Sequence, residues 1–177
     1  MAVQIGAKPD SGFDDPIGML MDCHRRIERF LNVLCVVAER ARGRALSGEE
    51  TAAVHAALQY FRLGGQRHNA DEEESLFPRL RTESSAEISE QLRGLESDHQ
   101  RANELHMAVE ELYSAWIDRG QLSEFDAKRL WSSAAQLKRL YEEHIQIEEK
   151  EVFPRAATVL RGEAIAAIGR EFQARRE

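Results

Sequence analysis

Apolar residues recur at steps of three and four along four long stretches of the chain, the spacing expected for one face of an α-helix. Capping residues, proline and glycine delimit these stretches. The predicted helices cover about residues 14–43, 47–78, 84–120 and 123–154. Pro78 and Pro154 are expected to kink or end the second and fourth helices, because proline has no backbone N–H to donate.

Short loops between long helices are typical of an antiparallel bundle. We therefore predict an all-α fold, an up-down-up-down four-helix bundle with a short C-terminal helix. The expected domain division is a mobile tail over 1–12, the bundle over 13–160, and a short helix or tail over 161–177. The amphipathic segment 165–172 is expected to pack against the bundle or to pair with another chain.

Histidine and glutamate interrupt the apolar faces of all four predicted helices. On the second and fourth helices a His precedes a Glu by four residues, which places both side chains on one face, one turn apart. The residues at these inward positions are His24, His68, Glu72, His99, His144 and Glu148. Because a buried carboxylate without a partner is costly, a bound metal is the expected partner.

A sequence repeat links these positions. Segments 68–79 (HNADEEESLFPR) and 144–155 (HIQIEEKEVFPR) share His, two Glu and Phe-Pro-Arg at a spacing of 76 residues. His24 and His99 are 75 residues apart. The chain therefore reads as two copies of one unit, a helix with a single His followed by a helix with His-x-x-x-Glu.

Imidazole combined with carboxylate suits first-row metals such as iron, manganese, zinc or cobalt, and does not suit copper(I) or calcium. We expect the six side chains to converge on two ions. Ferritin-like di-iron bundles use four Glu and two His, and this chain inverts that ratio. Two ferrous ions held by two Glu leave the site cationic, so we hypothesise a preference for binding or reducing an anionic oxygen species.

Composition narrows the class of protein. The chain has 177 residues and is 42% hydrophobic, enough for one domain with a sizeable core. Its net charge is −7 and its basic residues are scattered, which excludes a nucleic-acid binder. The start lacks a signal peptide pattern and the longest near-apolar run, 31–38, is too short for a membrane span. We expect a cytoplasmic protein without a membrane partner, with Cys23 and Cys35 reduced and buried.

The motif H-x-x-x-E-E-x-x-x-[LV]-F-P, used twice and preceded each time by a helix with one His, resembles the hemerythrin-like HHE cation-binding domain family over about residues 14–158. The resemblance implies a non-haem di-iron centre, two iron ions joined by an oxo or hydroxo bridge. By position, the terminal ligands would be His24, His68, His99 and His144, and the bridging ligands Glu72 and Glu148.

The chain departs from oxygen-carrying hemerythrins. Those proteins have a further His four residues along the third helix and an Asp in the fourth, whereas this chain has Asn103 and Glu148. The difference argues against carrier-type reversible oxygen binding, and the set is closer to bacterial HHE proteins and to the iron–sulfur centre repair family.

The sequence leaves more than one role open for several residues near the predicted ligands. Glu73 and Glu149 are expected behind the ligands or facing solvent, and Glu28 is either a third carboxylate or a boundary residue paired with an Arg. His106 is about 10 Å from His99 along the helix, too far to join it as a ligand, and is expected to hydrogen-bond in the core or to line an access route.

Five further residues lie near the predicted centre. Tyr141 is expected to pack in the core, with hydrogen-bond donation behind the ligands and metal binding as the alternatives. Phe77 and Phe153 are expected to seal the site at each proline. The pair 64–65, both Gly, either leaves a gap beside one metal or allows close helix packing.

The leading hypothesis is a protein that binds or senses dioxygen, or a related small species such as nitric oxide or peroxide, at an open iron position near Gly64. The alternatives are a di-iron enzyme that turns over peroxide or nitric oxide or repairs iron–sulfur clusters, and an interaction protein that responds to iron or oxygen state. The oligomeric state is left open.

Overall fold

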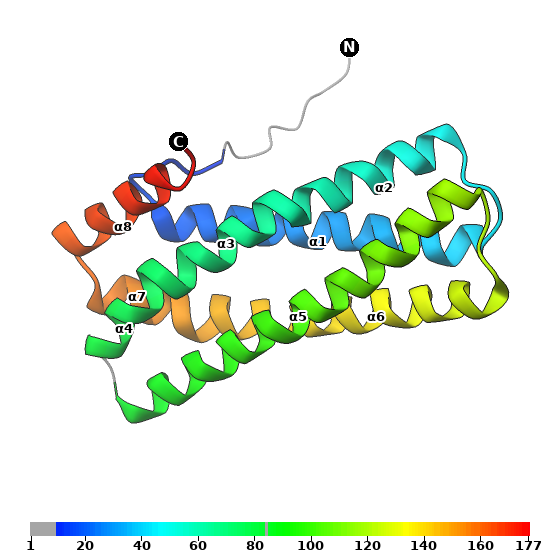
Figure 1. The fold of residues 1–177 in the computed structure, drawn as a ribbon. Helices are drawn as coiled ribbons and strands as arrows, with labels where there is room; N and C mark the ends of the chain where they lie inside the picture. Colours follow the sequence, from blue (N-terminus) through cyan, green and yellow to red (C-terminus); the bar gives the residue numbers. More distant parts are fainter. Residues whose placement is uncertain (1–9, 84) are drawn as a thin grey trace, which may run out of the picture.

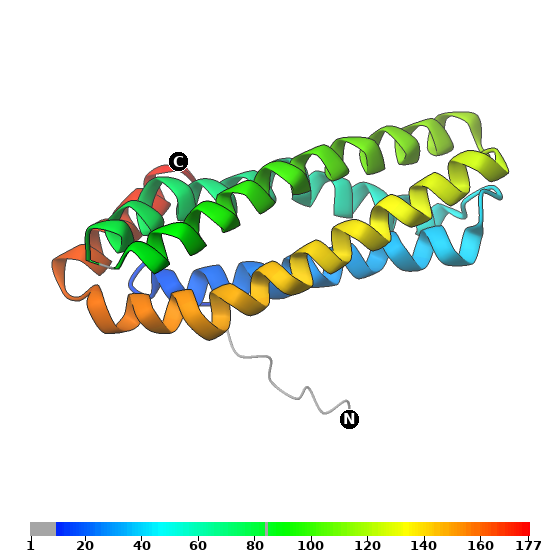
Figure 2. The ribbon, with the colours of Figure 1, turned by 90° about the horizontal axis from the view of Figure 1, so that it is seen from below.

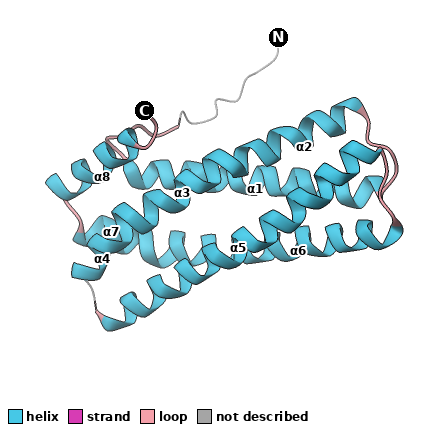
Figure 3. Ribbon diagram, viewed as in Figure 1, coloured by secondary structure: helices cyan, strands magenta, loops and turns pink. Residues whose placement is uncertain are grey.

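The computed structural model describes residues 10–83 and 85–177, which form helices joined by short turns (Figure 1, Figure 3). Four bundle helices run antiparallel to their chain neighbours, as both views show (Figure 1, Figure 2). The first is α1 (Pro16–Ala41) and the third is α5 (Ala86–Arg119). The second consists of α2 (Gly48–Tyr60), η1 (Phe61–Gly65), α3 (Gln66–Asp71), η2 (Glu72–Leu76) and α4 (Phe77–Glu83). The fourth consists of α6 (Glu124–Ile147), η3 (Glu148–Val152) and α7 (Phe153–Val159). The predicted all-α, up-down-up-down bundle is confirmed.

Capping residues set where the helices begin and end. The Gly18 N–H donates to the Asp15 carboxylate at 3.0 Å at the start of α1. Ser47 and Glu50 form a reciprocal capping box at the start of α2. Gly120 follows α5 with a φ of 73°, a left-handed conformation that glycine adopts without steric cost.

The two prolines do not end their helices, contrary to one of the sequence-based expectations. The second helix continues past Pro78 to Glu83, and the fourth continues past Pro154 to Val159. Residues 79–83, which the sequence pattern places beyond the second helix, are therefore helical.

A π-helical turn precedes each proline. The Phe77 N–H donates to the Glu72 carbonyl, and the Phe153 N–H donates to the Glu148 carbonyl, each spanning one residue more than an α-helical bond. The inserted residue interrupts the regular ladder next to the proline, which has no N–H to contribute. The sequence repeat is thus also a structural repeat, because η2 and η3 occupy equivalent positions.

A third π-helical turn, η1, breaks this symmetry, since its counterpart 137–141 lies within the regular helix α6. It ends at the glycine pair. A methyl group on Gly64 would come within 2.7 Å of the Tyr60 ring, so Gly64 allows close packing against this ring. A methyl group on Gly65 would meet only the Phe61 ring, at an ordinary 3.5 Å.

The apolar core is divided into two clusters along the bundle axis. On α1, Leu20 belongs to one cluster and Ile27 to the other, and His24 lies between them. The same order holds on α5, where Leu95 and Ala102 flank His99. The predicted polar residues therefore form a layer between two dry regions.

Helix α8 (Glu163–Ala174) packs against the bundle, which is the first of the two expectations for segment 165–172. Its Phe172 is fully buried. Beyond its end, Arg175 and Arg176 reach the buried carboxylate of Asp71 at 3.0 and 2.6 Å. Among the helices of residues 10–83 and 85–177, none is long and apolar enough to cross a bilayer.

Candidate metal centre

All six predicted donor residues meet in the polar layer, and each of the four bundle helices contributes. None is more than 3% exposed. They form two clusters, whose ligand atoms lie within 4.8 Å of one another. The first cluster contains His24, His68, Glu72 and Glu148, and the second contains Glu72, His99, His144 and Glu148. Both carboxylates are common to both clusters. We call the side of His24 and His68 the first position and the side of His99 and His144 the second position.

The four Nε2 atoms face the two shared carboxylates. Each has a carboxylate oxygen within 3.5 Å. The distances are 3.1 Å from His24 to Glu148, 3.5 Å from His68 to Glu72, 3.4 Å from His99 to Glu72, and 3.2 Å from His144 to Glu148. Donor atoms of this kind at these separations can surround an ion at ordinary metal–ligand distances.

Five of the donor atoms have no hydrogen-bond partner within the described part of the chain, whereas Nε2 of His99 and Nε2 of His144 lie 3.1 Å apart, at hydrogen-bond distance from each other. Both oxygens of Glu72 and of Glu148, and Nε2 of His24, are buried without a hydrogen-bond partner there. His24 is close to Glu148, but the contact does not have hydrogen-bond geometry. Leaving even one neutral buried acceptor unsatisfied costs about 1–3 kcal/mol, and a carboxylate costs more. The residues therefore fit a pair of first-row metal ions.

Without a metal, protons compensate the buried charges. Burial alone would lower the pKa of His24, but nearby Glu148 raises it to about 9. Burial likewise opposes the charge on His99, but Glu72 and Glu73 raise its pKa to about 10. Burial and the charge of Glu148 raise the pKa of Glu72. Metal ions must therefore displace protons from these imidazoles in order to bind.

Glu73 and Glu149 lie behind the donors, one of the two positions expected for them. Glu73 is hydrogen-bonded to Nδ1 of His99 at 2.7 Å, and Glu149 to Nδ1 of His24 at 2.9 Å. Each repeat thus supplies a carboxylate to the single His of the other repeat. A carboxylate at Nδ1 favours the tautomer whose Nε2 is free to bind a metal.

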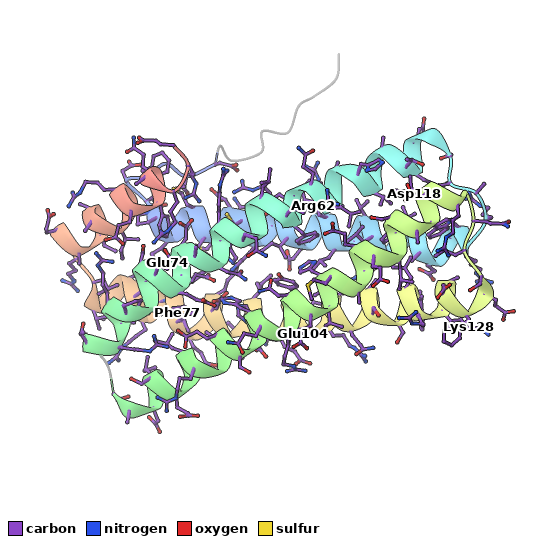
Figure 4. All side chains as sticks on the ribbon, in the orientation of Figure 1. Arg62, Glu74, Phe77, Glu104, Asp118 and Lys128 are labelled. Atoms are coloured by element: carbon purple, nitrogen blue, oxygen red, sulfur yellow. The ribbon has the colours of Figure 1, made fainter. Side chains whose placement is uncertain are left out.

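Phe77 and Phe153 stack on the same two histidines. The Phe77 ring, labelled in Figure 4, is nearly parallel to His99 with centroids 6.4 Å apart. The Phe153 ring stacks on His24 at 5.3 Å. Both phenylalanines are almost completely buried, and they close the donor layer on the side of the prolines.

The remaining candidates lie outside the two clusters. Glu28 is exposed and does not add a third carboxylate. His106 is hydrogen-bonded to the Tyr141 hydroxyl at 3.1 Å, and burial lowers the pKa of His106 to about 4. Tyr141 is buried and packs in the core, as expected.

A pocket of about 320 Å³ lies beside the donor layer. Gly65 and Tyr141, which line it, each precede a donor histidine by three residues. The other lining residues include Phe61, His106 and Asn69. The pocket runs from the surface to within one helical turn of His68 and His144.

Sequence reasoning missed one residue of the centre. Asp98 lies 3.7 Å from Nδ1 of His144. The sequence shows that Asp98 is next to His99, but it does not show that Asp98 faces His144 on another helix. The cysteines are both free, and Cys23 is buried as expected, whereas Cys35 is only half-buried.

The helical bundle and its two histidine–carboxylate clusters define a metal-binding bundle protein. Residues 15–156 match the family model described as the hemerythrin HHE cation binding domain, and the chain belongs to this family. The chain is also similar to a Haemophilus influenzae protein named only "Uncharacterized protein". The two are 27% identical over 168 residues, which cover 93% of this chain and 92% of the relative.

Proposed function

We propose that this protein holds two iron ions and binds or senses dioxygen, or a related small species such as nitric oxide or peroxide. The observation that carries the proposal is the sharing of Glu72 and Glu148 by two clusters of buried donors. A shared carboxylate with both oxygens unpartnered is suited to bridging two ions. The six proposed ligands are His24, His68, Glu72, His99, His144 and Glu148.

Different parts of the chain serve different tasks in this proposal. The donor histidines and glutamates hold the ions, and Glu73 and Glu149 orient two of the imidazoles. Phe77 and Phe153 exclude water from one side. When bound, iron would supply Lewis-acid and redox chemistry at an open coordination position.

The pocket supports access by a small ligand. The first position has Gly65 one turn from His68, where the second position has the bulky Tyr141 one turn from His144. Dioxygen, nitric oxide and peroxide are all much smaller than the pocket. We infer that the ligand approaches the first position over Gly65.

A sensing role is favoured by the contact between α8 and the donor layer. Asp71, which pairs with Arg175 and Arg176, is the residue directly before Glu72. A change in metal or ligand state that shifts η2 would therefore act directly on the C-terminal arginines, and such a change can be read by a partner protein.

Replacing Gly65 tests the proposed route. Leu at this position would occupy the pocket without altering a donor, whereas Gly94→Leu is a matched control on an exposed position of α5 with nothing within 4 Å. Reduced, iron-loaded proteins would be mixed rapidly with dioxygen or nitric oxide, and absorbance followed. We expect Gly65→Leu to react at least about tenfold more slowly at unchanged iron content, and Gly94→Leu to match the unmodified protein.

Gly65→Ala provides a milder variant, because its methyl group would sit at an ordinary distance from Phe61. Equal rates in the unmodified protein and both Gly65 variants would exclude this route. The absence of a spectral change with dioxygen, nitric oxide and peroxide in an iron-loaded protein would contradict the proposed binding function.

A further inference from the structure

The two metal positions differ in the carboxylates behind their histidines. At the second position, His99 is hydrogen-bonded to Glu73 at 2.7 Å and His144 has the Asp98 carboxylate 3.7 Å from its Nδ1. Both imidazoles of this position therefore have a negative charge at the nitrogen that does not face the donor layer.

The first position has only one such carboxylate. His24 is hydrogen-bonded to Glu149 at 2.9 Å. The Nδ1 of His68 is buried and has no hydrogen-bond partner among residues 10–83 and 85–177. The Nε2 atom of the buried His68 imidazole therefore faces the shared carboxylates, and its Nδ1 atom has no partner in the described residues.

The sequence repeat explains this difference. The residue directly before the single His is Cys23 in the first repeat and Asp98 in the second. A thiol is a weak hydrogen-bond acceptor and carries no charge while protonated. The sulfur of Cys23 already accepts a hydrogen bond from Arg26 at 3.2 Å.

Carboxylates at Nδ1 strengthen metal binding in two ways. They fix the ring orientation and tautomer, and they increase the basicity of the nitrogen that binds the metal. Loss of one such partner typically weakens metal affinity by about 10–100-fold. The second position has one hydrogen-bonded carboxylate and a second carboxylate 3.7 Å from its other imidazole, and should therefore hold its ion more tightly than the first position, which has one carboxylate.

We propose that the two ions are held unequally: the second position, at His99 and His144, fills first and retains its ion, and the first position, at His24 and His68, exchanges. This inference rests on the proposed metal pair. It also places the exchangeable ion beside His68, one helical turn from Gly65 in the wall of the pocket.

Metal titration of the full-length, metal-free protein tests the proposal. Zinc(II) serves as a redox-silent probe, in competition with a chromophoric chelator. We expect two ions per chain with dissociation constants at least about tenfold apart. Glu73→Gln should weaken the tighter class by about 10–100-fold, and Glu149→Gln should weaken the looser class by a similar factor. Glu143→Gln, on an exposed residue beside His144, is the control and should change neither.

A gain of affinity provides an independent check. Cys23→Asp would place a carboxylate where the second repeat has one, and should bring the looser class closer to the tighter class. Ions bound with equal affinity, or equal losses in both classes for Glu73→Gln and Glu149→Gln, would overturn the inference and leave the metal pair standing. Binding of fewer than two ions would instead overturn the metal pair itself.

Discussion

At the scale of single residues, the donors stand apart from other buried polar groups. Asp71 is also fully buried, but two arginines satisfy it. The oxygens of Glu72 and Glu148 have no comparable partner in the described residues. This contrast within one molecule supports a cation at the shared carboxylates and not simply a buried polar core.

The donors were predictable from sequence because helical spacing alone places a His and a Glu four residues apart on one buried face. Which histidine each outer carboxylate would bind was not predictable. The bonds from Glu73 to His99 and from Glu149 to His24 join different repeats, so they depend on how the helices pack. Spacing along one helix carries no information about such a contact.

His106 should make the metal-free protein less stable in acid. Its folded-state pKa, lowered by burial to about 4, lies below the ordinary value of 6.5. Between these values the unfolded chain binds a proton that the folded chain does not, so stability falls as the pH falls, by at most about 1.4 kcal/mol per pH unit. Urea unfolding at pH 7, 6 and 5 should show a weaker pH dependence for His106→Gln than for the unmodified protein. Parallel pH curves for the two proteins would contradict this role.

At the scale of helices, the prolines show where local rules fall short. Proline predicts an interruption of the helix. The π-helical turns η2 and η3 accommodate this interruption, so the two helices continue to Glu83 and Val159. The four bundle helices themselves followed from apolar periodicity and capping residues. Whether α8 packs against the bundle or pairs with another chain could not be predicted, because an amphipathic pattern does not show which surface the apolar face contacts.

The contact between α8 and the bundle should contribute strongly to stability. Replacing both Arg175 and Arg176 with Ala removes the partners of the buried Asp71 carboxylate. Breaking a buried pair in this way costs about 3–5 kcal/mol, because the remaining charge is left uncompensated. Chemical denaturation would measure the loss.

The matched control for this prediction lies within α8, just before these two arginines. Arg170 and Glu163 form an exposed ion pair, so Arg170→Ala should cost no more than about 1 kcal/mol. A double variant of Arg175 and Arg176 that is no less stable than Arg170→Ala would show that α8 is held by its apolar face alone.

At the scale of the whole molecule, duplication builds one site from two half-sites. Each repeat provides a single His, a His-x-x-x-Glu pair and a carboxylate for the other repeat, and the four bundle helices meet in one polar layer between two apolar clusters. The repeat in the sequence made this convergence predictable. The departures from symmetry, at Gly65 and Cys23, distinguish the two positions and follow from differences between the copies.

The most direct test of the central claim is plasma mass spectrometry of the purified protein, combined with optical spectra before and after reduction with dithionite and re-exposure to air. The proposed metal pair predicts about two irons per chain, with near-ultraviolet bands that bleach on reduction and return in air. A single ion per chain, or two zinc ions with no such bands, would contradict an oxygen-responsive di-iron centre.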